Sequence, residues 1–292
     1  MSTLELRPLS IGEILDRTFS LYRRNFLLFI GIAAIPQLLV LAFQLVQTAV
    51  IPPRFPVRPP VSTEFQAGFP NLSAGGWVGI LGVGIVAFIV YIVAYLFSQG
   101  GTVFAVSELY LGRTTTIGQS LGRVRGELLS LFGVVFLNGL ATGVAFLLLI
   151  IPGFYVACRL CVCVPAALLE NRGPRDSLER SYGLTQENAG RAFLIFLLYF
   201  VILYAALFLF DVPFAIGIQF AAHDPSMIRV LTALMQVGNF VAAVLITPVL
   251  TIAMSIFYFD LRVRKEAFDL QMMMNPLEGG VPTPRSATSL LS

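Results

Sequence analysis

Charged residues are scarce in this chain. Only 12% of its 292 residues are charged, whereas 57% are hydrophobic, and the mean hydropathy is +0.84. A soluble domain carries roughly a quarter charged residues, because its whole surface faces water. So little charge cannot cover the surface of a soluble fold of this length. The composition therefore indicates an integral membrane protein whose excess apolar surface faces lipid.

Histidine and cysteine are also rare. His223, beside Asp224, is the only histidine, so no second histidine completes a catalytic or metal-binding group around it. Cys158, Cys161 and Cys163 lie in one apolar stretch, where we interpret them as small residues at a helix–helix interface. The sequence therefore predicts no catalytic residue, no metal site and no cofactor, and we expect the protein not to be an enzyme.

Basic residues do not form a stripe interleaved with exposed aromatics, so the sequence predicts no nucleic-acid partner. Lys265 is the only lysine, and arginine supplies the rest of the basic charge. Arg54, Arg58 and Arg229 fall on one predicted side of the membrane. The other side carries Arg7, Arg17, Arg23, Arg24, Arg113, Arg123, Arg125, Arg172, Arg175, Arg180, Arg191, Arg262, Arg264, Lys265 and Arg285. Because basic residues favour cytoplasmic loops, this bias predicts that both termini are cytoplasmic.

Six apolar stretches are long enough to cross a bilayer, which takes about 20 residues of helix. They are Phe26–Ile51, Trp77–Phe97 with a helical extension towards Leu111, Leu128–Ile151, Gly153–Leu169, Ala192–Phe210 and Val230–Phe259. Pro152 and Gly153 separate the third and fourth stretches, so we predict a tight hairpin there. The chain is thus predicted to be an all-α polytopic membrane protein. Its transmembrane domain covers residues 1–270, and residues 271–292 form a disordered cytoplasmic tail.

Three segments on the arginine-rich side begin with the same capping pattern. Ser10 with Glu13 and Thr116 with Gln119 form capping boxes, and Gly173 followed by Pro174 starts a helix by another route. The residues assigned to these three amphipathic interfacial helices are Ser10, Glu13, Arg17, Thr116, Gln119, Arg123, Asp176 and Arg180. Two apolar stretches follow each one. We therefore predict three repeats of an interfacial helix plus a transmembrane hairpin, at about 9–111, 115–170 and 173–265.

Arg159 lies near the middle of the fourth apolar stretch, where a guanidinium costs at least about 2.5–3.5 kcal/mol. We expect it to face the interior with a partner. Asp211 is the first choice, ahead of the amides of Asn138, Gln99 and Gln236. Such a pair would either bind an anionic headgroup or substrate, or only hold helices together, and the sequence leaves both open.

A carboxylate ends each even-numbered stretch, close to an arginine. Glu108 precedes Arg113, Glu170 precedes Arg172, and Asp260 precedes Arg262, which predicts three equivalent interfacial ion pairs. In addition, Gly100-Gly101 and four prolines, Pro36, Pro165, Pro213 and Pro248, are expected to interrupt helices. Broken helices expose backbone in transporters, but they also occur as simple kinks.

Three stretches carry a resemblance to a known family. They are Leu6–Asp16; Ile151-Pro152-Gly153 through Arg159 to Pro165 and Glu170, followed by Leu178–Ser181; and Tyr258–Glu266. Together they resemble the glycerophosphoryl diester phosphodiesterase membrane domain family over most of the chain. Some members carry a soluble phosphodiesterase barrel after this domain, and none is expected here. Members without it are mostly uncharacterised bacterial inner-membrane proteins, so the resemblance implies that location and no phosphodiesterase activity.

The functional prediction is a non-enzymatic integral membrane protein that contacts lipid or binds a partner. The expected partners are membrane lipids and a membrane or cytoplasmic protein. The alternative is a transporter or channel for a small anionic or lipid-like substrate. A continuous polar cavity reaching Arg159 would favour transport, whereas a tightly packed interior would favour the lipid- or partner-binding module.

Overall fold

The computed structural model describes residues 8–50, 74–221 and 224–278, and these residues form helices and no strand. The helices are α1 (Ile11–Arg24), α2 (Phe26–Val50), α3 (Ala74–Tyr110), α4 (Ile117–Leu148), α5 (Ile150–Arg159), α6 (Cys163–Glu170), α7 (Pro174–Leu184), α8 (Ala189–Phe220) and α9 (Pro225–Glu278). The all-α prediction is confirmed. Six helical stretches are long and apolar enough to cross a membrane, as predicted, with α5 and α6 together forming the fourth.

Some predictions fall outside the described residues. These concern Arg7, Arg54, Arg58, His223, Arg285 and the tail from residue 279 onward. The tail was predicted to begin at residue 271, but α9 continues beyond Leu270 to Glu278.

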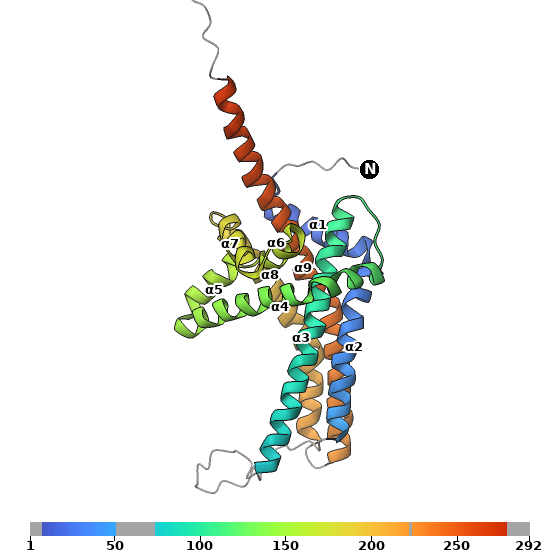
Figure 1. Ribbon diagram of the computed structural model, residues 1–292. Coiled ribbons are helices and arrows are strands. Elements are labelled where there is room, and N and C mark those ends of the chain that lie inside the picture. The colour runs from blue at the N-terminus through green and yellow to red at the C-terminus, as the bar shows by residue number, and fades with distance from the viewer. Residues whose placement is uncertain (1–7, 51–73, 222–223, 279–292) are drawn as a thin grey trace, which may run out of the picture.

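Four long helices, α2, α3, α8 and α9, run along one another and form the body of the molecule (Figure 1). The α9 helix packs against the other three and also against α1. The core lies where these helices approach α1 and α7, near the middle of Figure 1 and below the projecting end of α9, with Phe29, Ile32, Ile252 and Phe257 fully buried. We call this end, which carries α1, α7 and the start of α4, the arginine-rich end.

The α3 helix is continuous through Gly100 and Gly101, so the predicted interruption there is wrong. The two glycines instead allow close packing of helices. A Cβ on Gly100 would lie 2.9 Å from Val124 of α4, and one on Gly101 would lie 2.8 Å from Ile32 of α2. Small residues at such positions let membrane helices approach each other closely.

The prolines do not break the long helices either. Pro36 and Pro213 lie inside continuous α2 and α8, and Pro248 lies inside continuous α9. Pro165 occupies the first turn of α6, where a missing N–H costs no helical hydrogen bond. Transmembrane helices tolerate proline because neighbouring groups satisfy the freed carbonyl. The fifth predicted stretch therefore extends through Pro213 to Phe220 as one helix.

The turn between α4 and α5 lies at Leu149, which has an extended backbone. We predicted this turn at Pro152 and Gly153, but both residues lie in the first turn of α5. Gly153 packs against the ring of Phe146 on α4, so closely that a Cβ would lie 2.4 Å from it. The fourth predicted span is not one helix, since residues 160–162 separate α5 from α6.

The predicted helix starts are confirmed. Ser10 with Glu13 and Thr116 with Gln119 form complete capping boxes, and Gly173 caps α7 with Pro174 next to it. However, only α1 and α7 are helices separate from the apolar ones that follow them. In the second segment, α4 continues from its cap into the apolar stretch without a break, whereas Asn25 ends α1 and residues 185–188 separate α7 from α8. The threefold repeat itself stays a prediction.

Candidate functional site

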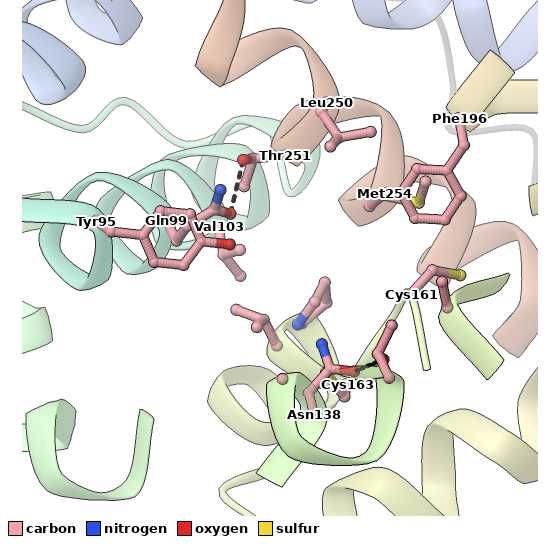
Figure 2. Close-up of a pocket in the computed structure, with 15 residues that line it drawn as sticks. Tyr95, Gln99, Val103, Asn138, Cys161, Cys163, Phe196, Leu250, Thr251 and Met254 are labelled. Carbon is pink, nitrogen blue, oxygen red and sulfur yellow. Dashed lines mark hydrogen bonds between the residues drawn. The ribbon is translucent and has the colours of Figure 1, made fainter. Parts of the chain in front are cut away.

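An inner cavity of about 270 Å³ lies between α3, α4, the α5–α6 segment, α8 and α9 (Figure 2). Its wall combines uncharged polar side chains with apolar ones, and none of the described residues that line it is charged. The lining residues are Tyr95, Gln99, Val103, Asn138, Gly139, Thr142, Ala157, Cys161, Cys163, Val164, Pro165, Phe196, Leu250, Thr251 and Met254. The cavity is therefore amphipathic rather than ionic.

Two side-chain amides supply the main hydrogen-bonding groups of the cavity. The Thr251 hydroxyl donates to Oε1 of Gln99 at 2.8 Å, and the Thr142 hydroxyl donates to Oδ1 of Asn138 at 3.4 Å. Both contacts occupy the amide oxygens. The amide nitrogens of Gln99 and Asn138 are hydrogen-bond donors, so the residues lining the cavity can donate to an oxygen of a guest molecule.

The sequence named Gln99 and Asn138 as polar residues within apolar stretches, but it did not bring them together. It did not single out Thr142, Thr251 or Tyr95, because threonine and tyrosine are ordinary in membrane helices. Two of the three cysteines, Cys161 and Cys163, also line the cavity, and Cys158 is separated from them by the end of α5. All three are free thiols in the packed region, in agreement with the interface interpretation.

Arg159 ends α5 and is only 2% exposed. Its guanidinium carbon lies 3.7 Å from the ring centre of Tyr182 on α7 and 5.8 Å from that of Tyr155. Its Nε and Nη1 atoms have no hydrogen-bond partner among the described residues. Arg159 thus faces the interior, as predicted, but its neighbours are aromatic rings and it does not line the inner cavity.

The expected ion pair between Arg159 and Asp211 is not formed. Oδ1 of Asp211 is buried without a hydrogen-bond partner in the described part of the chain. The reason is position along the molecule: Arg159 contacts α7 at the arginine-rich end, whereas Asp211 lies about 33 Å along α8 from that end. The amides proposed as alternatives are also elsewhere, since Gln236 donates to Thr48 at 2.6 Å.

The backbone carbonyl at the end of α5 is held by α7. The hydroxyls of Ser181 and Thr185 each donate to the Arg159 carbonyl oxygen at 2.9 Å, and both residues are fully buried. Because α5 ends at Arg159, this carbonyl has lost its helical partner. These two hydroxyls therefore fix the end of α5 against α7, a role that sequence patterns did not reveal.

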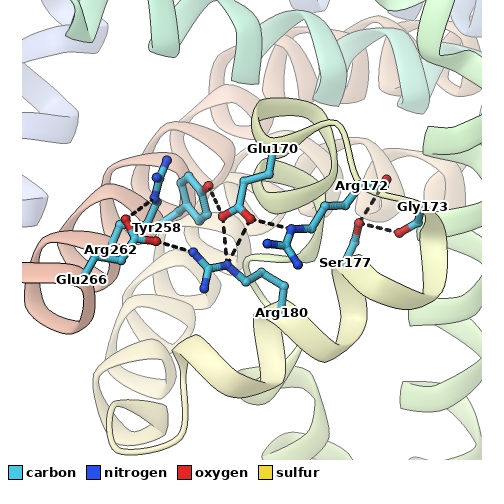
Figure 3. A network of polar contacts seen from close by, with 8 residues as sticks. All are labelled: Glu170, Arg172, Gly173, Ser177, Arg180, Tyr258, Arg262 and Glu266. Atoms are coloured by element: carbon cyan, nitrogen blue, oxygen red, sulfur yellow. Dashed lines mark hydrogen bonds and ion pairs between the residues drawn. The ribbon is translucent and has the colours of Figure 1, made fainter. Parts of the chain in front are cut away.

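A cluster of charged residues joins α6, α7 and α9 at the arginine-rich end (Figure 3). We call it the Glu170 cluster, and it consists of Glu170, Arg172, Arg180, Tyr258, Arg262 and Glu266. Glu170 accepts from Arg172 at 2.6 Å, from Arg180 at 2.9 Å and from the Tyr258 hydroxyl at 2.7 Å. Glu266 binds both Arg180 and Arg262. The cluster thereby ties three helices together.

The electrostatics of Arg180 follow from this cluster. Burial alone would disfavour the cation, but the carboxylates of Glu170 and Glu266 outweigh it and raise the pKa of the guanidinium. Arg123 has a similar contact, to Glu108 at 3.0 Å. Arg17 belongs to the first of the three predicted interfacial segments, as Arg123 and Arg180 belong to the other two, but it forms no ion pair within the described residues. Asp176 lies in the first turn of α7.

Two of the three predicted interfacial ion pairs are confirmed and one is wrong. Arg113 binds Glu108 at 3.6 Å, and Arg172 binds Glu170. Asp260 binds residues other than Arg262. It accepts from Arg191 at 2.8 Å, from Arg264 at 2.9 Å and from the backbone N–H of Leu9 at 2.7 Å. Asp260 therefore joins α9 to Leu9, which lies just before the start of α1.

No family model, curated protein or solved structure matches the chain. The resemblance to the glycerophosphoryl diester phosphodiesterase membrane domain family stays a prediction from the motifs quoted above.

Proposed function

We propose that this chain is a non-enzymatic integral membrane protein whose inner cavity binds part of a membrane lipid. The observation that carries the proposal is the amphipathic wall of the cavity. Gln99 and Asn138 present amide donors on one part of the wall, and Phe196, Leu250 and Met254 present apolar surface on another. A lipid has the same combination of ester oxygens and hydrocarbon within a short distance.

The size and charge of the cavity agree with an uncharged portion of a lipid. A volume of about 270 Å³ is too small for a whole lipid with its acyl chains. It suits a glycerol–ester region whose chains extend into the bilayer. A bare anion is a poorer guest, because the wall provides no positive charge to replace its hydration.

The transporter alternative depends on Arg159 as the anion-binding group. Arg159 does not line the inner cavity, and its guanidinium packs against Tyr182. This separation favours lipid binding over transport of a small anion. For location, we propose the bacterial cytoplasmic membrane with the arginine-rich end in the cytoplasm, supported by the arginine bias and by the family resemblance.

Filling the cavity tests the proposal. Gly139 lines it, and a Cβ at that position meets no atom within 4 Å, so Gly139→Phe can attach a ring at the cavity wall without displacing the neighbouring helices at its first atom. Gly143→Phe is the matched control, one turn further along α4, also with no atom within 4 Å and outside the lining. Native mass spectrometry after detergent exchange would measure retained lipid.

We expect Gly139→Phe to retain about tenfold less lipid than the native protein, a loss of about 1.4 kcal/mol in binding free energy. Gly143→Phe should retain the native amount. If both variants keep the same lipids at the same occupancy as the native chain, the cavity is not the binding site and the proposal is wrong.

A further inference from the structure

The turn of the α4–α5 hairpin is apolar throughout. We call residues 147–151 the hairpin tip: three leucines followed by two isoleucines. Leu147 is 88% exposed and Ile151 is 84% exposed, although both are large hydrophobic residues. From Val144 to Phe154 the chain has no polar side chain at all. A turn that emerged on the far side of a membrane would face headgroups and water, where such a surface is unfavourable.

The α5 helix is too short to carry the tip across a bilayer from where it is anchored. Its ten residues end at Arg159, whose carbonyl binds Ser181 and Thr185 of α7. Ten helical residues extend about 15 Å. The hydrocarbon core is about 30 Å thick. From the level of α7, the tip therefore reaches at most about half of that depth, and less if the hairpin is tilted away from the membrane normal.

The charged outer face of α7 indicates where this helix lies relative to the membrane. The side chains of Arg175 and Glu179 are 86% and 69% exposed and form an ion pair across one turn. Exposed charges of this kind belong in water or among headgroups, because charge is costly in hydrocarbon. The α7 helix therefore marks the membrane surface at the arginine-rich end.

The other arm of the hairpin is anchored to the same helix. Pro174, the first residue of α7, packs so closely on Gly133 of α4 that a Cβ there would lie 2.7 Å from its ring. The α4 helix also begins at the arginine-rich end and continues from its cap to Leu148 without a break. Consistent with this, Figure 1 shows α4 running across the direction of α2 and α3 rather than along it.

We infer that the α4–α5 hairpin is re-entrant: it enters the membrane from the arginine-rich end, turns within the hydrocarbon and returns to the same side. Its tip contacts the acyl chains of that leaflet. Only α2, α3, α8 and α9 then cross completely. The number of crossings stays even, so the two ends of the described chain remain on one side. This inference does not depend on lipid binding in the inner cavity.

Single-cysteine labelling tests the depth of the tip. In a full-length variant whose three native cysteines are replaced by alanine, Leu149→Cys would be treated with a membrane-impermeant maleimide in sealed vesicles of both orientations. Two variants mark the two surfaces: Glu179→Cys on α7, and Ser226→Cys at the start of α9, which is also exposed. We expect each marker to be labelled from one side only. Leu149→Cys should be labelled from neither side, and only after solubilisation in detergent. Labelling of Leu149→Cys from the same side as Ser226→Cys would overturn the inference.

Tryptophan fluorescence provides a second, positive measurement. Trp77 is the only tryptophan, so Trp77→Phe gives a background without one. Ile150→Trp places the probe at the tip, and Phe19→Trp places it on α1 as the interfacial control. With lipids brominated at different depths, Ile150→Trp should be quenched most by bromines deep in the acyl chains, and Phe19→Trp by bromines near the headgroups. Equal, shallow quenching of both probes would also overturn the inference.

Discussion

At the scale of single residues, the buried charges of this protein fall into two kinds. Asp260 has three partners, Arg191, Arg264 and the N–H of Leu9, and its carboxylate is fully buried. Arg159 is just as buried, but it has aromatic neighbours and no carboxylate partner among the residues that the structure describes. The stability of the fold should respond in opposite directions when these two charges are removed.

Asp260→Asn is expected to destabilise the protein. It leaves Arg191 and Arg264 without their shared carboxylate, and breaking a buried pair costs about 3–5 kcal/mol. Because both arginines are partly exposed, we expect about 2 kcal/mol. Thermal unfolding in detergent measures this as a lower midpoint. The control Glu179→Gln removes an exposed ion pair and should shift the midpoint little.

Arg159→Met is expected to raise the unfolding midpoint. The guanidinium is buried with unpaired Nε and Nη1 atoms, which costs several kcal/mol, whereas its stacking on Tyr182 returns about 2 kcal/mol. Methionine has a similar length and no charge to desolvate. A lower midpoint for this variant would mean that the arginine has a favourable partner in the membrane, such as an anionic lipid.

At the scale of helices, close packing depends on glycines, and a pair of adjacent glycines in the sequence does not indicate that the helix is interrupted there. Gly100 and Gly101 look like a helix interruption in sequence, but they let α3 contact α4 and α2. Gly84 lies on the same helix with open space around it. The same residue type therefore has different roles along one helix.

Gly100→Val should destabilise the protein by about 1–3 kcal/mol, because its branched side chain meets Val124 and Leu131 of α4 at close range. Gly84→Val, on the lipid-exposed surface, should be neutral or slightly stabilising. Urea or thermal unfolding of the two variants in the same detergent provides the comparison. Equal stability of both would show that α3 and α4 are not closely packed at Gly100.

At the scale of the whole molecule, the contact between Leu9 and Asp260 places the first and last helices at the same end. The arginine-rich end is therefore one surface, with α1, α7 and the Glu170 cluster on it. By the preference of arginine for the cytoplasm, we predict that this surface is cytoplasmic.

In intact cells, Ser20→Cys on α1 and Glu179→Cys on α7 should both resist an impermeant thiol reagent. Ser226→Cys should react. All three positions are exposed. Reaction of Ser20→Cys together with Ser226→Cys would place the ends of the described chain on different sides and contradict the fold. Reaction of Ser20→Cys and Glu179→Cys without Ser226→Cys would instead reverse the orientation only.

Local features of this protein were predictable from the sequence. Hydropathy over about 20 residues identified the six stretches, because crossing hydrocarbon requires a continuous apolar run. The capping boxes were found because each bond joins residues three apart. The pairs of Glu108 with Arg113 and of Glu170 with Arg172 were correctly expected because their partners, five and two residues apart, are also close in the sequence.

Only the tertiary structure decided which distant groups meet. The partners of Asp260 include Leu9 and Arg191, which are far away in sequence. Gln99 and Asn138 meet at the inner cavity, and Arg159 packs on Tyr182 rather than near Asp211. These contacts depend on the direction in which each helix leaves the membrane surface. A pattern of apolar residues determines that a helix enters hydrocarbon, but its direction is set by the helices that pack against it.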